Sequence, residues 1–217
     1  MLRHFAKPKT LAFTLLFFSA IPIMMGAVRV LQIPSGNLPL DDAKFLIIPY
    51  WHWFHALSGL LFGVLGPIQF ARVLQNKFGK FHRISGRVFV VAGMVLGLSG
   101  VGIFAQVPNS THLILDIMRV TAGFALILDL AIAMYAIRKR DIAKHKAWMI
   151  RSYAIGMGAG AISIVMFPIY IITGAPIEGL LSDIVFVSCW LSCVGLAEVI
   201  IGRFTLAKTA SAVGPNL

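Results

Sequence analysis

Charged residues are scarce in this chain of 217 residues, because Asp, Glu, Lys and Arg together make up only 12% of it. Water-soluble domains carry roughly 25% charged residues, so the composition excludes an ordinary soluble fold. Hydrophobic residues account for 59% of the chain, and its mean hydropathy is +0.88. These values are typical of an integral membrane protein.

Polar stretches long enough for a soluble domain are also missing, because apolar runs of about 20 residues, each able to cross a bilayer, fill most of the chain. Backbone groups in lipid must bond to one another, and the alternation typical of a β-barrel is absent, so each run is predicted to be a helix. We expect a single all-α polytopic domain, an antiparallel bundle of six transmembrane helices with the second to fifth at its centre. The expected spans are Thr10–Leu31, Trp51–Leu74, Ile84–Ala105, Asp116–Ile137, Ala147–Ile172 and Leu180–Leu206.

Acidic residues are few, with eight Asp and Glu against 19 Lys and Arg, and the formal net charge is +11. The basic residues lie before the first span and around the second and fourth connections, whereas the other loops are mainly acidic. This positive-inside pattern predicts that both termini are cytoplasmic. Membrane topology therefore explains the charge better than nucleic-acid binding does, and anionic lipid headgroups are the expected partners of the basic loops.

Cysteine is limited to Cys189 and Cys193, which stand four residues apart on one helix face. Neither belongs to a C-x-x-C-H sequence, so the motif by which c-type haem is covalently attached is absent. H-E-x-x-H pairs and Cys/His clusters typical of zinc sites are missing as well. No A-x-A cleavage site follows the first apolar run, so we expect that run to be a mature helix rather than a signal peptide.

Histidines, by contrast, are present at the ends of the expected helices. His52 and His55 begin the second span and His112 precedes the fourth, on the predicted outer side; His82 and His145 precede the third and fifth, on the cytoplasmic side. Alternate helices of an up-down bundle lie diagonally opposite, and cofactor ligands project inward from them. A histidine of the second span and His112 are therefore candidates to ligate one haem iron from both sides, and His82 and His145 are candidates to ligate another. In the second span His55 is preferred to His52 because it lies deeper.

Four arginines lie within about two turns of these candidate ligands. Guanidinium groups bind carboxylates in a bidentate manner, so the arginines are candidates to hold haem propionates. Contact with lipid headgroups is the alternative. The four are Arg83, Arg87 and Arg151 on the cytoplasmic side and Arg119 on the outer side.

Glycines recur at close helical spacing in three expected helices. Glycine lets a backbone approach another helix or a flat ligand closely. The sequence leaves open whether they serve helix packing or make room for a porphyrin face. They are Gly59, Gly63, Gly66, Gly93, Gly97, Gly100, Gly156, Gly158 and Gly160.

Two acidic residues lie inside spans, Asp129 near the middle of the fourth and Glu198 in the inner half of the sixth. Ionisable residues in lipid commonly mark proton relays or substrate sites. They support a second hypothesis, a proton-coupled transporter. Hydrogen bonding between helices in a protonated state is the structural alternative.

Three of the histidines stand in longer motifs. The motifs are His55-x-x-x-Gly59, Gly66-Pro-Ile-Gln-Phe70, His82-Arg-x-x-Gly-Arg87 with Phe89, and Asp141-x-x-x-His145-x-x-Trp148-Met-x-Arg151-Ser-Tyr153-Ala. Over roughly residues 50–160 they resemble the family of predicted bacterial membrane proteins called domain of unknown function (DUF) 2306. The resemblance implies a bacterial inner-membrane protein and assigns no activity. His112 is outside its motifs.

The arrangement is also similar to that of the two-haem transmembrane cytochromes b, in which four central helices ligate haems in alternate pairs. That similarity implies one or two b-type haems, a quinol or other redox partner, and membership of a membrane oxidoreductase. Function by fold analogy is a weak warrant, so two other hypotheses stay open. One is the proton-coupled transporter, and the other is a non-catalytic assembly or scaffold subunit.

Overall fold

The computed structural model describes residues 8–36, 49–71, 76–106, 113–175 and 177–212. These residues form six helices that are long and apolar enough to cross a membrane, which confirms the expected all-α polytopic class. The helices are α1 (Pro8–Ser35), α3 (Pro49–Phe70), α5 (Gly79–Gln106), α6 (Leu113–Arg138), α7 (Ile142–Thr173) and α8 (Gly179–Ala212).

Most helices extend beyond the apolar stretches from which they were expected. For example, α7 covers Ile142–Thr173, whereas the expected span begins at Ala147. The added first turn is polar, and the amphipathic ends of a spanning helix can lie in the headgroup region. The exception is α3, which ends at Phe70 rather than Leu74. Residues 72–75 lie outside the described part of the chain.

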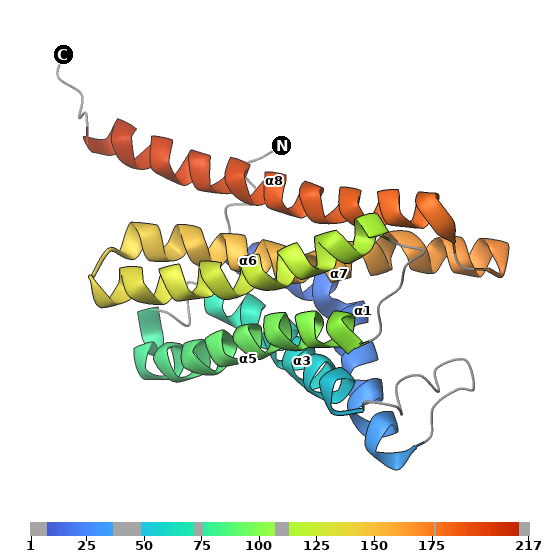
Figure 1. Ribbon diagram of the computed structural model, residues 1–217. Helices are drawn as coiled ribbons and strands as arrows, with labels where there is room; N and C mark the ends of the chain where they lie inside the picture. Colours follow the sequence, from blue (N-terminus) through green and yellow to red (C-terminus); the bar gives the residue numbers. More distant parts are fainter. Residues whose placement is uncertain (1–7, 37–48, 72–75, 107–112, 176, 213–217) are drawn as a thin grey trace.

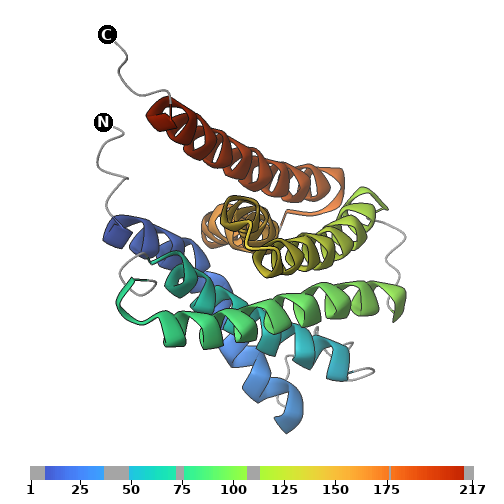
Figure 2. The same ribbon diagram turned by 90° about the vertical axis from the view of Figure 1, so that its left-hand side faces the viewer.

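Helices that are consecutive in the sequence pack against one another along the whole series from α1 to α8. In addition, α1 packs against α7 and covers the side on which α3 and α7 make little direct contact. Figures 1 and 2 show α8 along the outer side of the α6–α7 pair, away from α3 and α5. The central four helices are therefore α3, α5, α6 and α7, as the sequence predicted.

The turn between α6 and α7 is the tightest connection in the described chain and belongs to the basic end of the bundle. We use "basic end" for the end that holds the α3–α5 and α6–α7 connections. Arg140 has φ 61°, a left-handed conformation in which the chain reverses. Asp141 then caps α7, because its Oδ1 accepts a hydrogen bond from the Lys144 N–H at 2.9 Å. The cap sets where α7 begins and so places His145 in its first turn.

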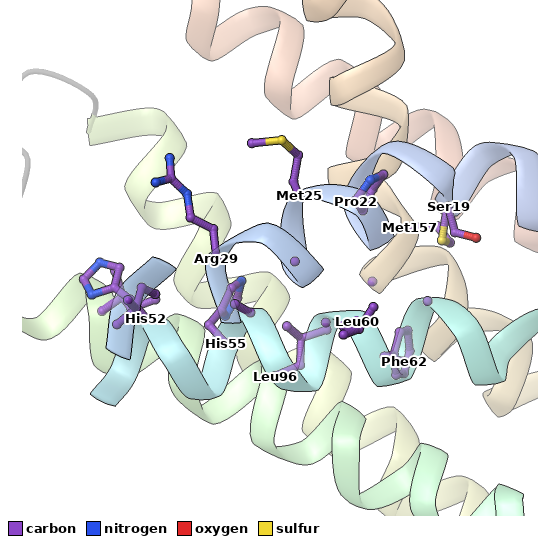
Figure 3. A pocket seen from close by; sticks show the side chains of 17 residues that line it. Ser19, Pro22, Met25, Arg29, His52, His55, Leu60, Phe62, Leu96 and Met157 are labelled. Atoms are coloured by element: carbon purple, nitrogen blue, oxygen red, sulfur yellow. The ribbon is translucent and has the colours of Figure 1, made fainter. Parts of the chain in front are cut away.

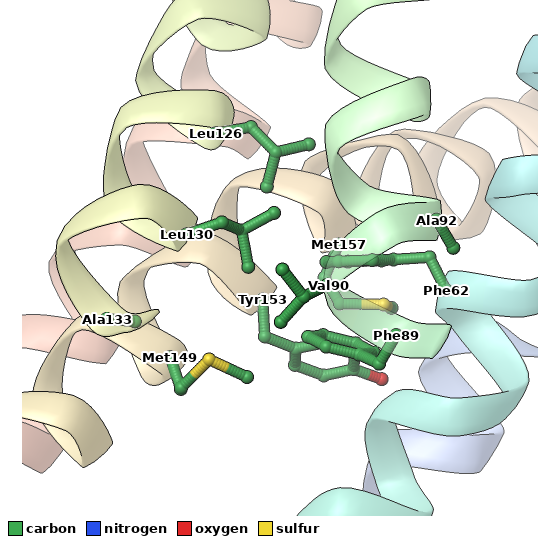
Figure 4. Packing of buried hydrophobic residues seen from close by; sticks show 10 residues of the cluster. All are labelled: Phe62, Phe89, Val90, Ala92, Leu126, Leu130, Ala133, Met149, Tyr153 and Met157. Atoms are coloured by element: carbon green, nitrogen blue, oxygen red, sulfur yellow. The ribbon is translucent and has the colours of Figure 1, made fainter. Parts of the chain in front are cut away.

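An aromatic cluster fills the middle of the bundle (Figure 4). The rings of Phe62 and Phe89 stack with their centroids 4.3 Å apart, and the Tyr153 ring lies 5.8 Å from that of Phe62. Leu130 of α6 is fully buried beside them. Because α3, α5, α6 and α7 each contribute buried side chains to this cluster, it stabilises the packing of the four central helices.

Most of the glycines let helices pack closely. A Cβ placed on Gly97 would lie 2.7 Å from the carbonyl oxygen of Gly123, and one on Gly123 would lie 2.9 Å from that of Gly97. Side chains occupy the space beside others, since the Phe62 ring covers Gly156 and the Trp190 ring covers Gly158. Small residues commonly bring membrane helices together in this way. At these positions the structure favours helix packing over room for a porphyrin.

Candidate functional site

The candidate histidines lie at both ends of the bundle. His82 and His145 share the basic end, where they are close enough to interact electrostatically. His55 lies on α3 toward the opposite end, where His52 is one turn nearer the helix start. His112 lies outside the described residues. The structure therefore places His82 and His145 at the same end of the bundle, and of the proposed pair His55 and His112 it describes only His55.

His145 is oriented by a hydrogen bond across the α6–α7 interface. Its Nδ1 lies 2.9 Å from the carbonyl oxygen of Ala133 on α6. A carbonyl can only accept a hydrogen bond, so Nδ1 must carry the proton. In the neutral ring the other nitrogen, Nε2, then has a lone pair. Such an imidazole is ready to accept a hydrogen bond or to coordinate a metal.

His55 has the same tautomer for a different reason. Its Nδ1 lies 3.2 Å from the hydroxyl oxygen of Ser99 on α5. The single hydroxyl proton of Ser99 is donated to the Leu96 carbonyl at 3.1 Å, so Ser99 accepts from His55. His55 therefore also keeps Nε2 as an acceptor.

His82 is bonded differently, through Gln69 at the end of α3. The orientation that satisfies both groups of the Gln69 amide places its oxygen 3.2 Å from the Gly86 N–H and its nitrogen 3.0 Å from His82 Nδ1. In that orientation Nδ1 accepts and Nε2 carries the proton. The opposite amide orientation would set the oxygen against the His82 carbonyl oxygen and the nitrogen against the Gly86 N–H. Gln69 thus favours the His82 tautomer that is protonated at Nε2.

An ionic cluster joins α6, α7 and α8 in the half of the bundle toward the basic end. Arg151 grips Glu198 with two hydrogen bonds, Nε to Oε1 at 2.5 Å and Nη2 to Oε2 at 2.8 Å. The Arg151 guanidinium also lies over the Trp148 ring, 4.7 Å from its centroid. Asp129 is only 6% exposed and interacts electrostatically with both Arg151 and Glu198. The two intramembrane acids noted in the sequence thus share one basic partner.

This ionic cluster lies well inside the helices. Asp129 is nine residues before the end of α6, and Arg151 is nine residues after the start of α7. Nine residues are about two and a half helical turns, or about 13 Å along the axis. Charges at such depth are costly unless they are paired, which is why membrane helices seldom carry them without a functional reason.

The other candidate arginines have less specific surroundings. Arg83 and Arg87 are exposed on α5 at the basic end. Arg119 forms an ion pair of 3.2 Å with Asp116 one turn earlier on α6, and its guanidinium lies 6.0 Å from the Phe186 ring centroid. Among the described residues, Arg83 and Arg87 have no carboxylate partner like the one that holds Arg151. They are therefore better placed than Arg151 to bind an anionic group.

The groups that orient the histidines were not among the predicted site residues. Gln69 and Ser99 stand in apolar spans, where a polar side chain is itself a signal, and Gln69 belongs to the Gly66–Phe70 motif. The Ala133 carbonyl carries no sequence signal at all, because every residue has one. Glu198 was singled out, but its pairing with Arg151 across 47 residues was not.

The comparisons with known proteins agree with the motifs. Residues 52–201 match the profile of the family DUF2306, described as a predicted membrane protein. The match extends past residue 160, where the resemblance seen in the motifs ended, and takes in the ionic cluster. No curated protein and no solved structure matches the chain. Since the profile covers more than half of the sequence and the fold has six candidate membrane spans, this chain belongs to the DUF2306 family of predicted membrane proteins.

Proposed function

We propose that this chain is a transmembrane electron-transfer protein that holds b-type haem at the two ends of its bundle. The observation that supports this proposal is that His145 Nδ1 and His55 Nδ1, toward opposite ends, each lie at hydrogen-bond distance from an oxygen atom. In the neutral rings these contacts leave Nε2 of both histidines as an acceptor. Histidine ligands of metals almost always donate their other ring N–H to a carbonyl, carboxylate or water in this way. Bound haem would supply a one-electron redox couple.

The proposed sites are two rather than one. Phe62, Phe89 and Tyr153 lie about two turns inward from the histidines on their helices and fill the space between the two ends. A planar cofactor at one end is therefore separated from the other by packed side chains. At the basic end His82 is the proposed second ligand, with Arg83 and Arg87 for the propionates. At the opposite end the corresponding residues are His112 and Arg119.

Ligation by His82 requires one local change. Its Nδ1 accepts a hydrogen bond from Gln69, which leaves Nε2 protonated. Ligation would need a half-turn of this amide, which would free Nε2 but would set the amide oxygen against the His82 carbonyl oxygen and the amide nitrogen against the Gly86 N–H. His145, whose Nδ1 is bonded to the Ala133 carbonyl, is therefore the better-supported ligand at this end.

We also infer that the basic end faces the cytoplasm across a bacterial inner membrane. Arg83 and Arg87 are exposed there, together with the basic residues of the α6–α7 turn. Basic residues near helix ends are retained on the cytoplasmic side. Anionic lipid headgroups would then contact this end.

Purified protein, produced with ample haem supply, is expected to show a b-type reduced-minus-oxidised spectrum. The expected stoichiometry is up to two haems per chain, because the two ends are separate. Absorbance spectroscopy with a pyridine haemochrome assay measures both. Protein that remains folded by size-exclusion chromatography yet shows no haem signal would contradict the electron-transfer proposal.

A second candidate function is proton-coupled transport, which the ionic cluster favours. Asp129 is almost fully buried, and Arg151 is already engaged by Glu198 through two hydrogen bonds. Of the two carboxylates in this cluster, Asp129 is therefore the one that Arg151 does not bind with two hydrogen bonds. In the proposed orientation it lies in the cytoplasmic half of the membrane. A buried carboxyl that exchanges protons beside a fixed ion pair is a common element of proton relays.

The transport candidate predicts that Asp129→Asn stops proton flux. Protein in liposomes loaded with a pH-sensitive dye would be given a potassium diffusion potential with valinomycin, and the internal pH followed. Wild type is expected to exceed empty liposomes several-fold, and Asp129→Asn to fall to their level, because an amide cannot release a proton. Asp116→Asn is the matched control, since Asp116 is also buried on α6 but pairs with Arg119. Equal flux in wild type and Asp129→Asn would reject this candidate.

A further inference from the structure

A cavity of about 300 Å³ lies between α1, α3, α5 and α7, separate from the ionic cluster and from the histidines of the basic end. Its polar end holds Arg29, His52 and His55, and its apolar end holds Ser19, Phe62 and Met157 (Figure 3). The α1 residues that line it run from Ser19 to Ile33, about 21 Å along the helix axis, so the cavity is long and narrow. We call the part between Met25 and Ser19 the apolar half.

The apolar half opens to the lipid-facing surface at Met25. This side chain lines the cavity and is 46% exposed, and the exposed Met24 and Val28 continue the same apolar surface along α1. At the other end of the apolar half, Phe62 and Met157 line the cavity and are only 2% and 9% exposed. The cavity thus connects the surface that faces the lipid with the interior of the bundle.

The apolar half gives neither water nor a polar ligand a set of partners. Among the described residues that line it, the only polar side chain is Ser19, whose hydroxyl proton is donated to the Leu15 carbonyl on its own helix at 2.9 Å. Water needs several polar partners to occupy a cavity, so it is excluded from this half. A void would deprive the lining side chains of packing contacts, and an apolar occupant restores them.

We propose that the apolar half binds the terminal part of one acyl chain of a membrane phospholipid. Ser19 lies near the middle of α1, and the methyl ends of acyl chains meet near the middle of the bilayer. The chain enters past Met25 with its methyl end first and packs against Leu60, Phe62 and Met157. Its headgroup stays outside the protein, so the site selects the chain, and phospholipids are the main source of such chains in a bilayer.

Gly59 leaves room for the chain where the apolar half begins. A Cβ on Gly59 would have Leu96 Cδ1 as its nearest neighbour at 3.6 Å, an ordinary contact, whereas a Cβ on Gly63 would lie 2.9 Å from Ile23. Close helix packing thus explains glycine at position 63 but not at position 59. Because Gly59 lies one turn inward from His55, the chain does not need the His55 imidazole, and the site depends on neither haem nor proton transport.

Photolabelling of the full-length protein in liposomes tests this proposal. The two probes are phosphatidylcholines that carry a diazirine either at the methyl end of one chain or next to its ester. The methyl-end probe is expected to give adducts on Phe62 and Met157, identified by mass spectrometry of peptides, because lipid that stays at the surface cannot reach these buried side chains. The ester probe is expected to label exposed side chains such as Leu31 and neither of the buried ones.

Gly59→Leu places a side chain in the cavity and is expected to reduce the Phe62 and Met157 adducts to background. Gly195→Leu on α8 is the matched control and should keep them, because a Cβ on Gly195 meets no described atom within 4 Å. Adducts confined to exposed side chains in wild type, or equal labelling of Met157 by the two probes, would overturn the proposal. Loss of the adducts on addition of a small molar proportion of oleate would also overturn it, because the occupant would then be a free fatty acid.

Discussion

His145→Asn is expected to remove the haem of the basic end completely while leaving the fold intact. The Asn side-chain N–H reaches the position of His145 Nδ1, so it can still donate to the Ala133 carbonyl that the histidine contacts at 2.9 Å. Asn has no counterpart of Nε2 and cannot replace an axial imidazole. Reduced-minus-oxidised spectra should lose one component, and the component assigned to His55 should stay.

The His145→Asn variant distinguishes two roles for His145, haem ligation and a purely structural hydrogen bond. If His145 served only to join α6 and α7 through its hydrogen bond, Asn would preserve that role and the spectrum would match that of wild type. The scaffold hypothesis makes this second prediction. His145→Phe, which loses both the ligand and the hydrogen bond, is the matched comparison: it should lose the haem component and also unfold at a lower temperature. An unchanged spectrum in His145→Asn would exclude haem ligation by this residue.

Gly97→Val is expected to lower the stability of the bundle more than the histidine and carboxylate substitutions do. A Cβ at this position would lie 2.7 Å from the Gly123 carbonyl oxygen and 2.9 Å from Ile127. The first neighbour is backbone, so α5 and α6 must separate to relieve the overlap. Overpacking of this kind costs about 1–3 kcal/mol and sometimes more. The melting temperature in detergent should fall by several degrees, which a thermal unfolding assay measures.

Gly195→Val provides the control, because valine has the same cost of helix propensity at both positions. A Cβ on Gly195 meets no described atom within 4 Å, so only that intrinsic cost applies. The difference between the two variants then reports the α5–α6 contact alone. Equal melting temperatures would mean that α5 and α6 are not in contact at Gly97 and Gly123.

The fold class followed from properties that the sequence carries locally. Apolar runs of spanning length require helices, because lipid offers no partners to backbone groups. The positions of Lys and Arg predict orientation for a similarly direct reason. The motifs around His55, His82 and His145 were sufficient to identify the family, which the profile match confirms. Helix ends were less predictable, since α3 ends at Phe70 and polar end turns have no hydropathy signal.

The tertiary structure alone decided what the polar groups in these helices contact. From the sequence, Asp129 and Glu198 lie in different spans and Arg151 is a candidate for lipid or propionate contact, but packing of α6, α7 and α8 makes the three one ionic cluster. The sequence likewise does not assign the tautomers of His55 and His145, which depend on Ser99 and on the Ala133 carbonyl. The physical reason is common to both cases. Hydropathy along a chain reports transfer into lipid, residue by residue, whereas a hydrogen bond between helices depends on rotation and depth that only packing sets.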